Sequence, residues 1–179
     1  LQHVIGDPDA ESTVTTIVKE WGTGSGNSAR KWASAAALWR IYQAAKVKSL
    51  SHLCDWSVGR INKLSRDDDP KIMRAAVYAM KMLARKAGVQ EFSESLTRIV
   101  SRPDQNDQWT ELRQLIAGVV NDAMGHSPNG RERAYALLNT WMNAEQDGAV
   151  WTALYTLVTN KSHDASKSIM LIKALQQNR

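Results

Sequence analysis

Apolar residues recur at helical spacing through most of this 179-residue chain. The clearest case is the stretch 67–88, where Asp69 before Pro70 is typical of a helix start and Gly88 of a helix end. Between these signals, apolar residues return every three or four positions: Ile72, Ala75, Ala76, Ala79, Met80 and Leu83. This spacing predicts a helix over residues 69–87 that buries one side.

The same spacing predicts eight more helices, separated by short polar turns. In chain order they cover about residues 8–21, 28–45, 49–65, 90–101, 107–124, 128–146, 149–159 and 165–177. Asp7, Ser49 and Asp107 are the expected N-terminal caps. Residues 22–28 hold three glycines in seven positions and are expected to form a flexible linker. The pattern therefore predicts an all-α protein with about nine helices, in one domain over residues 1–179.

Bulky apolar residues indicate that the helices form a repeat. One such residue in every second helix recurs after 35, 43 and 42 positions: Trp21, Trp56, Ile99 and Trp141. Each is followed by a polar turn and then by a helix with a bulky residue in its first turns: Trp32, Met73, Trp109 and Trp151. A period of about 40 residues with two helices per unit is typical of helical solenoids. We therefore expect the members of each set to occupy equivalent places between stacked helix pairs.

Over residues 14–158 this pattern is similar to that of HEAT and armadillo repeat proteins. The Asp and Arg ladder of HEAT units is present only in part, as residues 67–69 and Arg74. The tryptophans and the stretch 73–76 also resemble the helical tails of large bacterial signalling NTPases. The resemblance implies antiparallel helix pairs stacked as a short right-handed solenoid, and, for a signalling tail, a sensor or scaffold portion without a nucleotide site.

Several features set the expected location and context of the chain. No stretch approaches the roughly 20 apolar residues that a membrane span needs. The first residues lack the basic and apolar regions of a secretory signal. The chain also lacks a starting Met, which indicates a piece of a larger protein. We expect a cytoplasmic protein that makes no membrane contact, whereas the sequence does not indicate an oligomeric state.

Charge is distributed unevenly along the chain. Residues 30–86 hold 13 Lys and Arg against 4 Asp, a net charge of +9, whereas the rest of the chain carries −4. Such an excess is either a solvated helix surface or a surface for an acidic partner or nucleic acid. The candidate binding residues are the bases of this region: Arg30, Lys31, Arg40, Arg60, Lys63, Lys71, Arg74, Lys81 and Arg85.

Signatures of catalysis and of metal or cofactor binding are missing from the sequence. A single Cys54 excludes an internal disulfide and four-cysteine zinc sites. His52, Cys54 and Asp55 lie close together on one predicted helix, but no further ligand accompanies them. The glycines of residues 22–28 lack the GK[ST] ending of a phosphate-binding loop. Residues 67–69 are interpreted as carboxylates that stabilise a helix N-terminus. We therefore expect no catalytic residues, no metal and no cofactor.

Three function classes are compatible with these observations. The leading hypothesis is a non-enzymatic scaffold or sensor domain that binds protein or peptide. The alternative is nucleic-acid binding through residues 30–86. An enzymatic hypothesis, a base-excision glycosylase on a HEAT-like fold, depends on Asp55 beside Trp56 alone. Most of the seven tryptophans are expected in the core, with Trp56 the first candidate for exposure.

Overall fold

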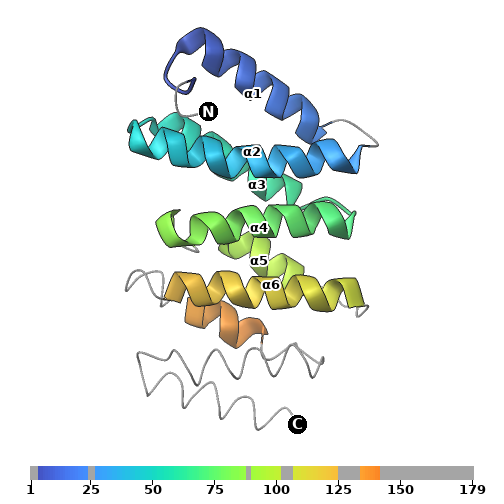
Figure 1. Ribbon diagram of the computed structural model, residues 1–179. Helices are drawn as coiled ribbons and strands as arrows, with labels where there is room; N and C mark the ends of the chain where they lie inside the picture. Colours follow the sequence, from blue (N-terminus) through green and yellow to red (C-terminus); the bar gives the residue numbers. More distant parts are fainter. Residues whose placement is uncertain (1–3, 24–26, 88–89, 102–106, 125–133, 142–179) are drawn as a thin grey trace, which may run out of the picture. The chain divides into compact units, whose positions relative to one another are not determined.

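A computed structural model describes residues 4–23, 27–87, 90–101, 107–124 and 134–141 of the chain. Every regular element in these ranges is a helix and none is a strand, so the predicted all-α class is confirmed for the described part (Figure 1). The helices predicted at 149–159 and 165–177, the start of the helix at 128, and Gly88 all lie outside the described residues. None of the described helices is long and apolar enough to cross a membrane.

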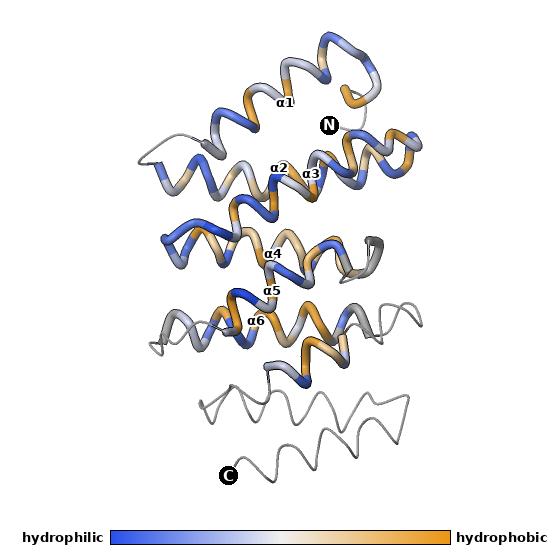
Figure 2. Tube along the Cα trace, turned by 180° about the vertical axis from the view of Figure 1, so that it is seen from behind, coloured by the Kyte–Doolittle hydropathy of each residue, from blue (hydrophilic) through white to orange (hydrophobic). Residues whose placement is uncertain are grey.

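The chain divides into two compact units, residues 1–82 and 83–179. The first unit contains α1 (Pro8–Thr23), α2 (Ser28–Val47), α3 (Ser51–Leu64) and α4 (Pro70–Ala87) as far as Met82. Helix α2 packs against both α1 and α3. Apolar and polar positions are interleaved along α3 (Figure 2), as expected for a helix with one buried side.

The core of the first unit contains the predicted apolar sides of α3 and α4. In α3 the buried residues are Leu53, Cys54, Ser57, Ile61 and Leu64, as the spacing predicts. The predicted positions of α4 in this unit, from Ile72 to Met80, are buried, and Met73 and Val77 are buried with them. Leu83 and Ala84, which belong to the second unit, are also buried. The core therefore reaches around more of α4 than the predicted stripe.

The tryptophans of the first unit do not lie where the sequence predicts. Trp32 and Trp21 keep 58% and 37% of their surface exposed, and Trp39 and Trp56 are half-buried. The buried side of α2 instead consists of smaller residues: Ser34, Ala35, Leu38, Ile41, Tyr42, Ala44 and Ala45. Apolar and polar residues occur on every side of α2, so periodicity does not identify the buried side. The small residues allow α1 and α3 to approach closely.

Aspartates begin two of the helices, as predicted. The Oδ1 atom of Asp7 accepts from the backbone N–H groups of Asp9 and Ala10 at 3.1 and 3.2 Å. The Oδ1 atom of Asp69 accepts from the N–H of Lys71 at 2.9 Å. Pro70 and Pro8 then occupy the first helical position, where a missing N–H costs nothing.

The predicted cap Ser49 is wrong, because this residue ends α2 and does not begin α3. Ser49 has a φ of 58°, in the left-handed region, and Leu50 holds the cap position of α3. The N–H of Leu50 donates to the carbonyl of Ala45 at 2.9 Å, and that of Ser49 donates to Lys46 at 3.3 Å. These two bonds form the Schellman motif that commonly ends helices.

Replacing Ser49 by Gly should therefore raise the free energy of unfolding by about 0.5–1 kcal/mol. Glycine adopts a positive φ without the steric cost that a Cβ carries there. Urea unfolding monitored by circular dichroism measures the change, with Ser51→Gly at the start of α3 as a control that should not stabilise. A loss of stability in Ser49→Gly would contradict the Schellman assignment.

The second unit is helical over its described residues and follows the predicted pattern closely. It contains η1 (Gln90–Phe92), α5 (Ser93–Val100), α6 (Asp107–Met124) and helical residues 134–141. The helix predicted at 90–101 thus starts with a short 3-10 turn. The apolar residues at helical spacing in these elements are buried, apart from half-buried Leu115: Phe92, Leu96, Ile99, Val100, Trp109, Leu112, Ile116, Val119, Val120, Tyr135, Leu138 and Trp141.

The bulky residues that suggest a repeat differ in burial along the chain. Ile99 and Trp141 of the first set are 1% and 0% exposed, whereas Trp21 is 37% exposed. In the second set Met73 and Trp109 are buried, Trp32 is exposed, and Trp151 lies outside the described residues. The expected equivalence of these positions therefore does not extend to their burial.

Candidate functional site

The predicted basic residues are concentrated on two helices that contain no acid. Together, α2 and α4 hold nine Lys and Arg residues and no Asp or Glu. Five of the predicted binding residues are exposed to solvent: Arg30, Arg40, Lys63, Lys71 and Arg74. Three more are half-buried: Lys31, Arg60 and Lys81. The side chain of Arg85 lies outside the described part. A role for these residues in binding stays a prediction.

The solvent side of α2 carries aromatic and apolar residues. Trp32 is 58% exposed and Val47 is 76% exposed, with half-buried Trp39 between them along the helix. The guanidinium carbon of Arg40 lies 5.2 Å from the centre of the Trp39 ring, a cation–π arrangement. This side of α2 is thus an apolar ridge with a base beside its tryptophan.

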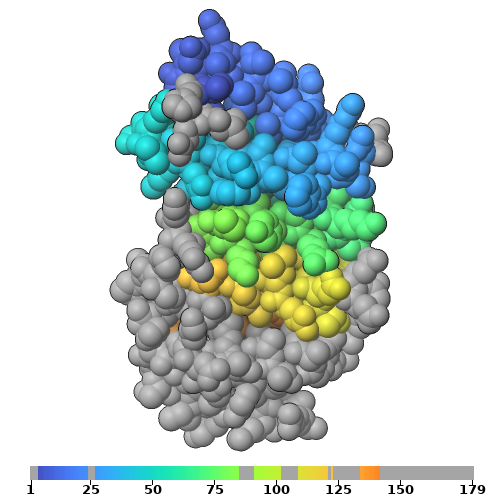
Figure 3. Space-filling model, in the orientation of Figure 1, coloured from blue at the N-terminus to red at the C-terminus, as the bar shows by residue number. Residues whose placement is uncertain are grey.

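The solvent side of α4 is basic, with one aromatic residue. Lys71, Arg74, Tyr78 and Lys81 follow one another at helical spacing, and Tyr78 is 51% exposed. All four belong to the first unit. Figure 3 shows side chains of α2 and α4 reaching one surface of this unit. We give the name α2–α4 face to a set of exposed and half-buried residues on the solvent sides of the two helices: Trp32, Trp39, Arg40, Val47, Lys71, Arg74, Tyr78 and Lys81.

Two polar contacts connect the N-terminal ends of α2 and α4. The Ser28 hydroxyl donates to Oδ2 of Asp69 at 2.8 Å. The ammonium of Lys31 pairs with Oδ2 of Asp67 at 2.7 Å, and both side chains are about four-fifths covered. The bond from the backbone N–H of Lys71 and then the bond from Ser28 hold the pKa of Asp69 below its usual value. These contacts fix where the two basic helices begin.

The aspartates at the start of α4 have the structural role that the sequence predicts. Asp69 caps the helix, and Oδ1 of Asp67 accepts from the N–H of Asp69 at 3.0 Å. Within the described ranges, no group of three or more His, Cys, Asp or Glu residues could hold a metal ion. The structure therefore assigns these carboxylates to helix initiation and to the ion pair with Lys31.

The helix α3 residues that could have formed a metal site point in different directions. The Nε2 atom of His52 lies 2.8 Å from Oε1 of Glu11 in α1, and the His52 side chain is 64% exposed. Cys54 is buried, with its Sγ 3.9 Å from the carbonyl oxygen of Tyr42. Asp55 is exposed. The structure thus does not bring His52, Cys54 and Asp55 together.

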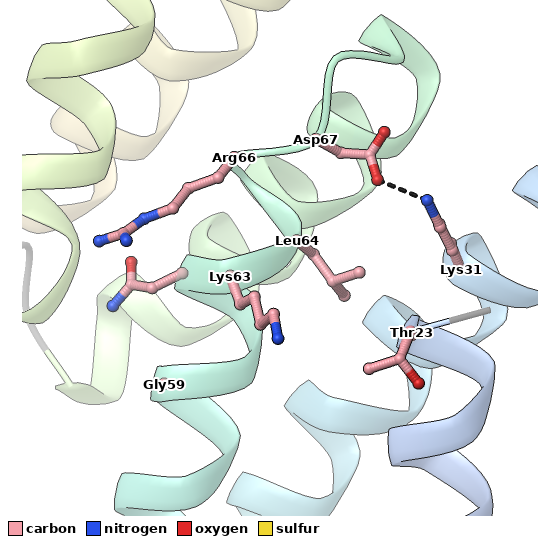
Figure 4. Close-up of a pocket in the computed structure, with 9 residues that line it drawn as sticks. Thr23, Lys31, Gly59, Lys63, Leu64, Arg66 and Asp67 are labelled. Carbon is pink, nitrogen blue, oxygen red and sulfur yellow. Dashed lines mark hydrogen bonds and ion pairs between the residues drawn. The ribbon is translucent and has the colours of Figure 1, made fainter. Parts of the chain in front are cut away.

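A pocket of about 680 Å³ opens where α1 and α3 end and α2 begins (Figure 4). It receives three basic side chains, Lys31, Lys63 and Arg66, and one acid, Asp67. Its other lining residues are small or uncharged: Gly22, Thr23, Gly59, Asn62 and Leu64. The sequence does not reveal this pocket, because its lining comes from three separate stretches of the chain, residues 22–23, residue 31 and residues 59–67. The one local signal is Gly59, a glycine in the middle of a helix.

The comparisons with known proteins leave the fold and the surfaces as the basis for function. No protein-family model, no curated protein and no solved structure matches the chain. For the glycosylase hypothesis, Asp55 is exposed, Trp56 is half-buried, and neither lines the pocket. A cleft carboxylate between aromatic residues is what that reaction needs. The α2–α4 face and the pocket are the features that can support a functional proposal.

Proposed function

We propose that this chain is a non-enzymatic binding domain that captures an acidic segment of a partner protein on the α2–α4 face. One observation supports this proposal most strongly: Trp32 stands 58% exposed on a helix that contains bases and no acid. A large apolar side chain in water has an unfavourable hydration free energy that a partner can relieve. Tryptophan is also among the residues that contribute most to protein interfaces.

The charge of the α2–α4 face favours an acidic partner. The face contains four bases and no acid: Arg40, Lys71, Arg74 and Lys81. This composition favours a positive potential. Acidic side chains placed opposite Lys71, Arg74 and Lys81 would accelerate association and fix the orientation of the bound segment. A neutral or basic segment would lack this attraction.

The arrangement of apolar and charged groups favours a protein over a nucleic acid. Trp32, Trp39 and Val47 form an apolar ridge on α2, and the bases of α4 lie beside it. A protein interface has this anatomy, with apolar and aromatic residues at the centre and charges at the rim. An acidic amphipathic helix would place apolar residues on the ridge and its Asp and Glu toward α4.

We further propose that the helices belong to a short right-handed solenoid that serves as a scaffold or sensor portion of a larger regulatory protein. The repeat period of about 40 residues and the similarity to HEAT and armadillo proteins support this architecture. In such arrays successive helices present one continuous surface to a partner. Helices α2 and α4 begin on the same side of the unit (Figure 1), where Lys31 pairs with Asp67, and this arrangement fits such a use.

A second candidate function is nucleic-acid binding by the same face. The acid-free bases of α2 and α4 could follow a phosphate backbone, and the Trp39 ring under Arg40 could stack with a base. The two functions differ in salt dependence. Binding to nucleic acid falls steeply with salt, since counterions are released, whereas an interface with an apolar centre keeps more of its affinity.

A selection experiment tests the proposal. A library of random 16-residue peptides is displayed on phage and selected on the full chain at physiological salt. Counter-selection uses the variant Trp32→Ala, which removes the exposed aromatic group. A 20-nucleotide single strand and a duplex of the same length are measured in parallel by fluorescence anisotropy.

The proposal expects enriched peptides that combine several Asp or Glu residues with at least two large apolar residues. Their affinity should exceed that of either oligonucleotide at physiological salt. Enriched peptides without acidic character, or oligonucleotide binding that is tighter than any selected peptide, would contradict the protein-binding proposal and favour the second candidate.

A further inference from the structure

We infer that the α2–α4 face binds helix α1 of a second copy of this chain, so that copies associate head to tail. The inference rests on the proposed function, because it assigns an acidic partner segment to the same face. Both surfaces belong to the first unit. The solvent side of α1 provides the evidence.

Two neighbouring rows of residues on α1 differ in their surroundings. One row faces α2: Val18 is buried, and a Cβ built at Gly22 would lie 3.0 Å from the hydroxyl oxygen of Ser34. The next row contains Ile17 and Trp21, which are 39% and 37% exposed. In Figures 1 and 2, α1 is the outermost of the described helices of the first unit. Ile17 and Trp21 thus form an apolar strip in contact with solvent, which we call the α1 strip.

Acidic residues accompany the α1 strip. Residues 7–23 hold four acids and one base, Lys19, which lies on nearly the opposite side of the helix from Ile17. Asp9 and Glu20 are exposed. They are 11 residues apart, which is about three helical turns, so they lie on the same side of α1. Glu20 follows Ile17 by three positions and is therefore its neighbour on the surface. The solvent side of α1 is acidic and amphipathic.

The spacing of the two acids matches the spacing of bases on α4. Asp9 and Glu20 are separated by about 16 Å along the helix, at about 1.5 Å per residue. Lys71 and Lys81 are separated by 10 residues, or about 15 Å. A helix that lies beside α4 can therefore place one acid opposite each base. Its apolar strip then lies on the ridge of α2 at Trp32, which gives an apolar centre with charges at the rim.

Charge disfavours a symmetric contact between two α1 helices. The solvent side of α1 presents Asp9 and Glu20 and, within this helix, no base beside them, so two such sides would bring like charges together. A contact between α1 and the α2–α4 face brings opposite charges together. This contact joins two different surfaces, so association continues beyond the dimer unless a ring closes.

Sedimentation equilibrium of the full chain at physiological salt measures the association. The average mass of the wild type should rise above the monomer value of 19.9 kDa between about 10 and about 500 µM, as expected for a weak contact. The variant Ile17→Gln, Trp21→Gln loses the α1 strip and keeps the face, whereas Trp32→Ala loses the centre of the face and keeps the strip. Each variant alone should associate at least about tenfold more weakly than the wild type.

Mixing the two variants tests whether the contact joins different surfaces. An equimolar mixture should associate as tightly as the wild type and stop at the dimer, because only one intact strip and one intact face meet. Both variants change exposed side chains, and urea unfolding checks that they stay folded. The charge variants give an independent check: Asp9→Lys, Glu20→Lys and Lys71→Glu, Lys81→Glu should each weaken association, and their mixture should restore it.

Two results would overturn the inference. The wild type would remain a monomer up to about 500 µM, or it would associate while the mixtures of variants stay monomeric, as a contact between identical surfaces would behave. Neither result affects the proposed function, whose failure would appear as selected acidic peptides that bind Trp32→Ala as tightly as the wild type.

Discussion

Replacing Leu38 by Ala should lower the free energy of unfolding by about 2–5 kcal/mol, the largest loss of stability that we expect from one substitution. Leu38 is 0% exposed and belongs to the side of α2 that packs between α1 and α3. Its removal leaves a cavity that the neighbouring helices can fill only in part. Urea unfolding of the purified chain, followed by circular dichroism, measures the loss.

Trp32 on the same helix is the matched comparison. Although it is the larger side chain, it is 58% exposed, so Trp32→Ala should cost less than about 1 kcal/mol. The pair of variants therefore tests which side of α2 is buried. A larger loss for Trp32→Ala than for Leu38→Ala would place the tryptophan in the core and would remove the basis of the α2–α4 face.

The double variant Lys71→Glu, Lys81→Glu should weaken the binding of a selected acidic peptide by about 100-fold at low salt. Both residues lie on the solvent side of α4, and each reversal replaces attraction of the peptide by repulsion. Added salt should reduce the difference between the variant and the wild type, because it screens charges at the exposed rim. Surface plasmon resonance at two salt concentrations measures both effects.

The control for net charge is the double variant Lys19→Glu, Arg30→Glu. Both side chains are exposed, and neither belongs to the α2–α4 face. This variant changes the net charge by the same amount, so it reports the long-range effect alone. If it weakened the peptide as much as Lys71→Glu, Lys81→Glu does, the binding would depend on total charge and not on the face.

Local signals in the sequence predicted much of the fold. Asp7 with Pro8 and Asp69 with Pro70 begin helices because an aspartate acceptor and a proline act within one turn, without help from distant residues. The buried side of α3 was also predictable, because polar residues separate its apolar positions clearly.

Errors arose where the deciding information is not local. On α2 apolar and polar residues occur on every side, so the packing of α1 and α3, and not periodicity, selects Leu38 over Trp32 for the core. Ser49 resembles an N-terminal cap, but the backbone bond from Leu50 to Ala45 makes it the end of the preceding helix. The pocket combines three separate stretches of the chain, which no spacing rule connects.

The candidate site was predictable only as a charge excess. Counting bases identified residues 30–86, but the count does not show that Lys31 is paired with Asp67 or that Lys71 is exposed. The sequence predicts Trp32 and Trp39 in the core, because exposed and buried tryptophans have the same spacing in the sequence. The proposed binding surface differs from the rest of the chain in the solvent exposure of its aromatic side chains, which the amino-acid composition does not show.

The most direct test of the proposed function is a calorimetric titration of one selected acidic peptide into the wild-type chain and into Trp32→Ala. The account predicts that the variant binds at least about tenfold more weakly while its urea unfolding curve changes little. Equal affinity of the peptide for the two proteins would contradict the proposal that this face captures an acidic partner.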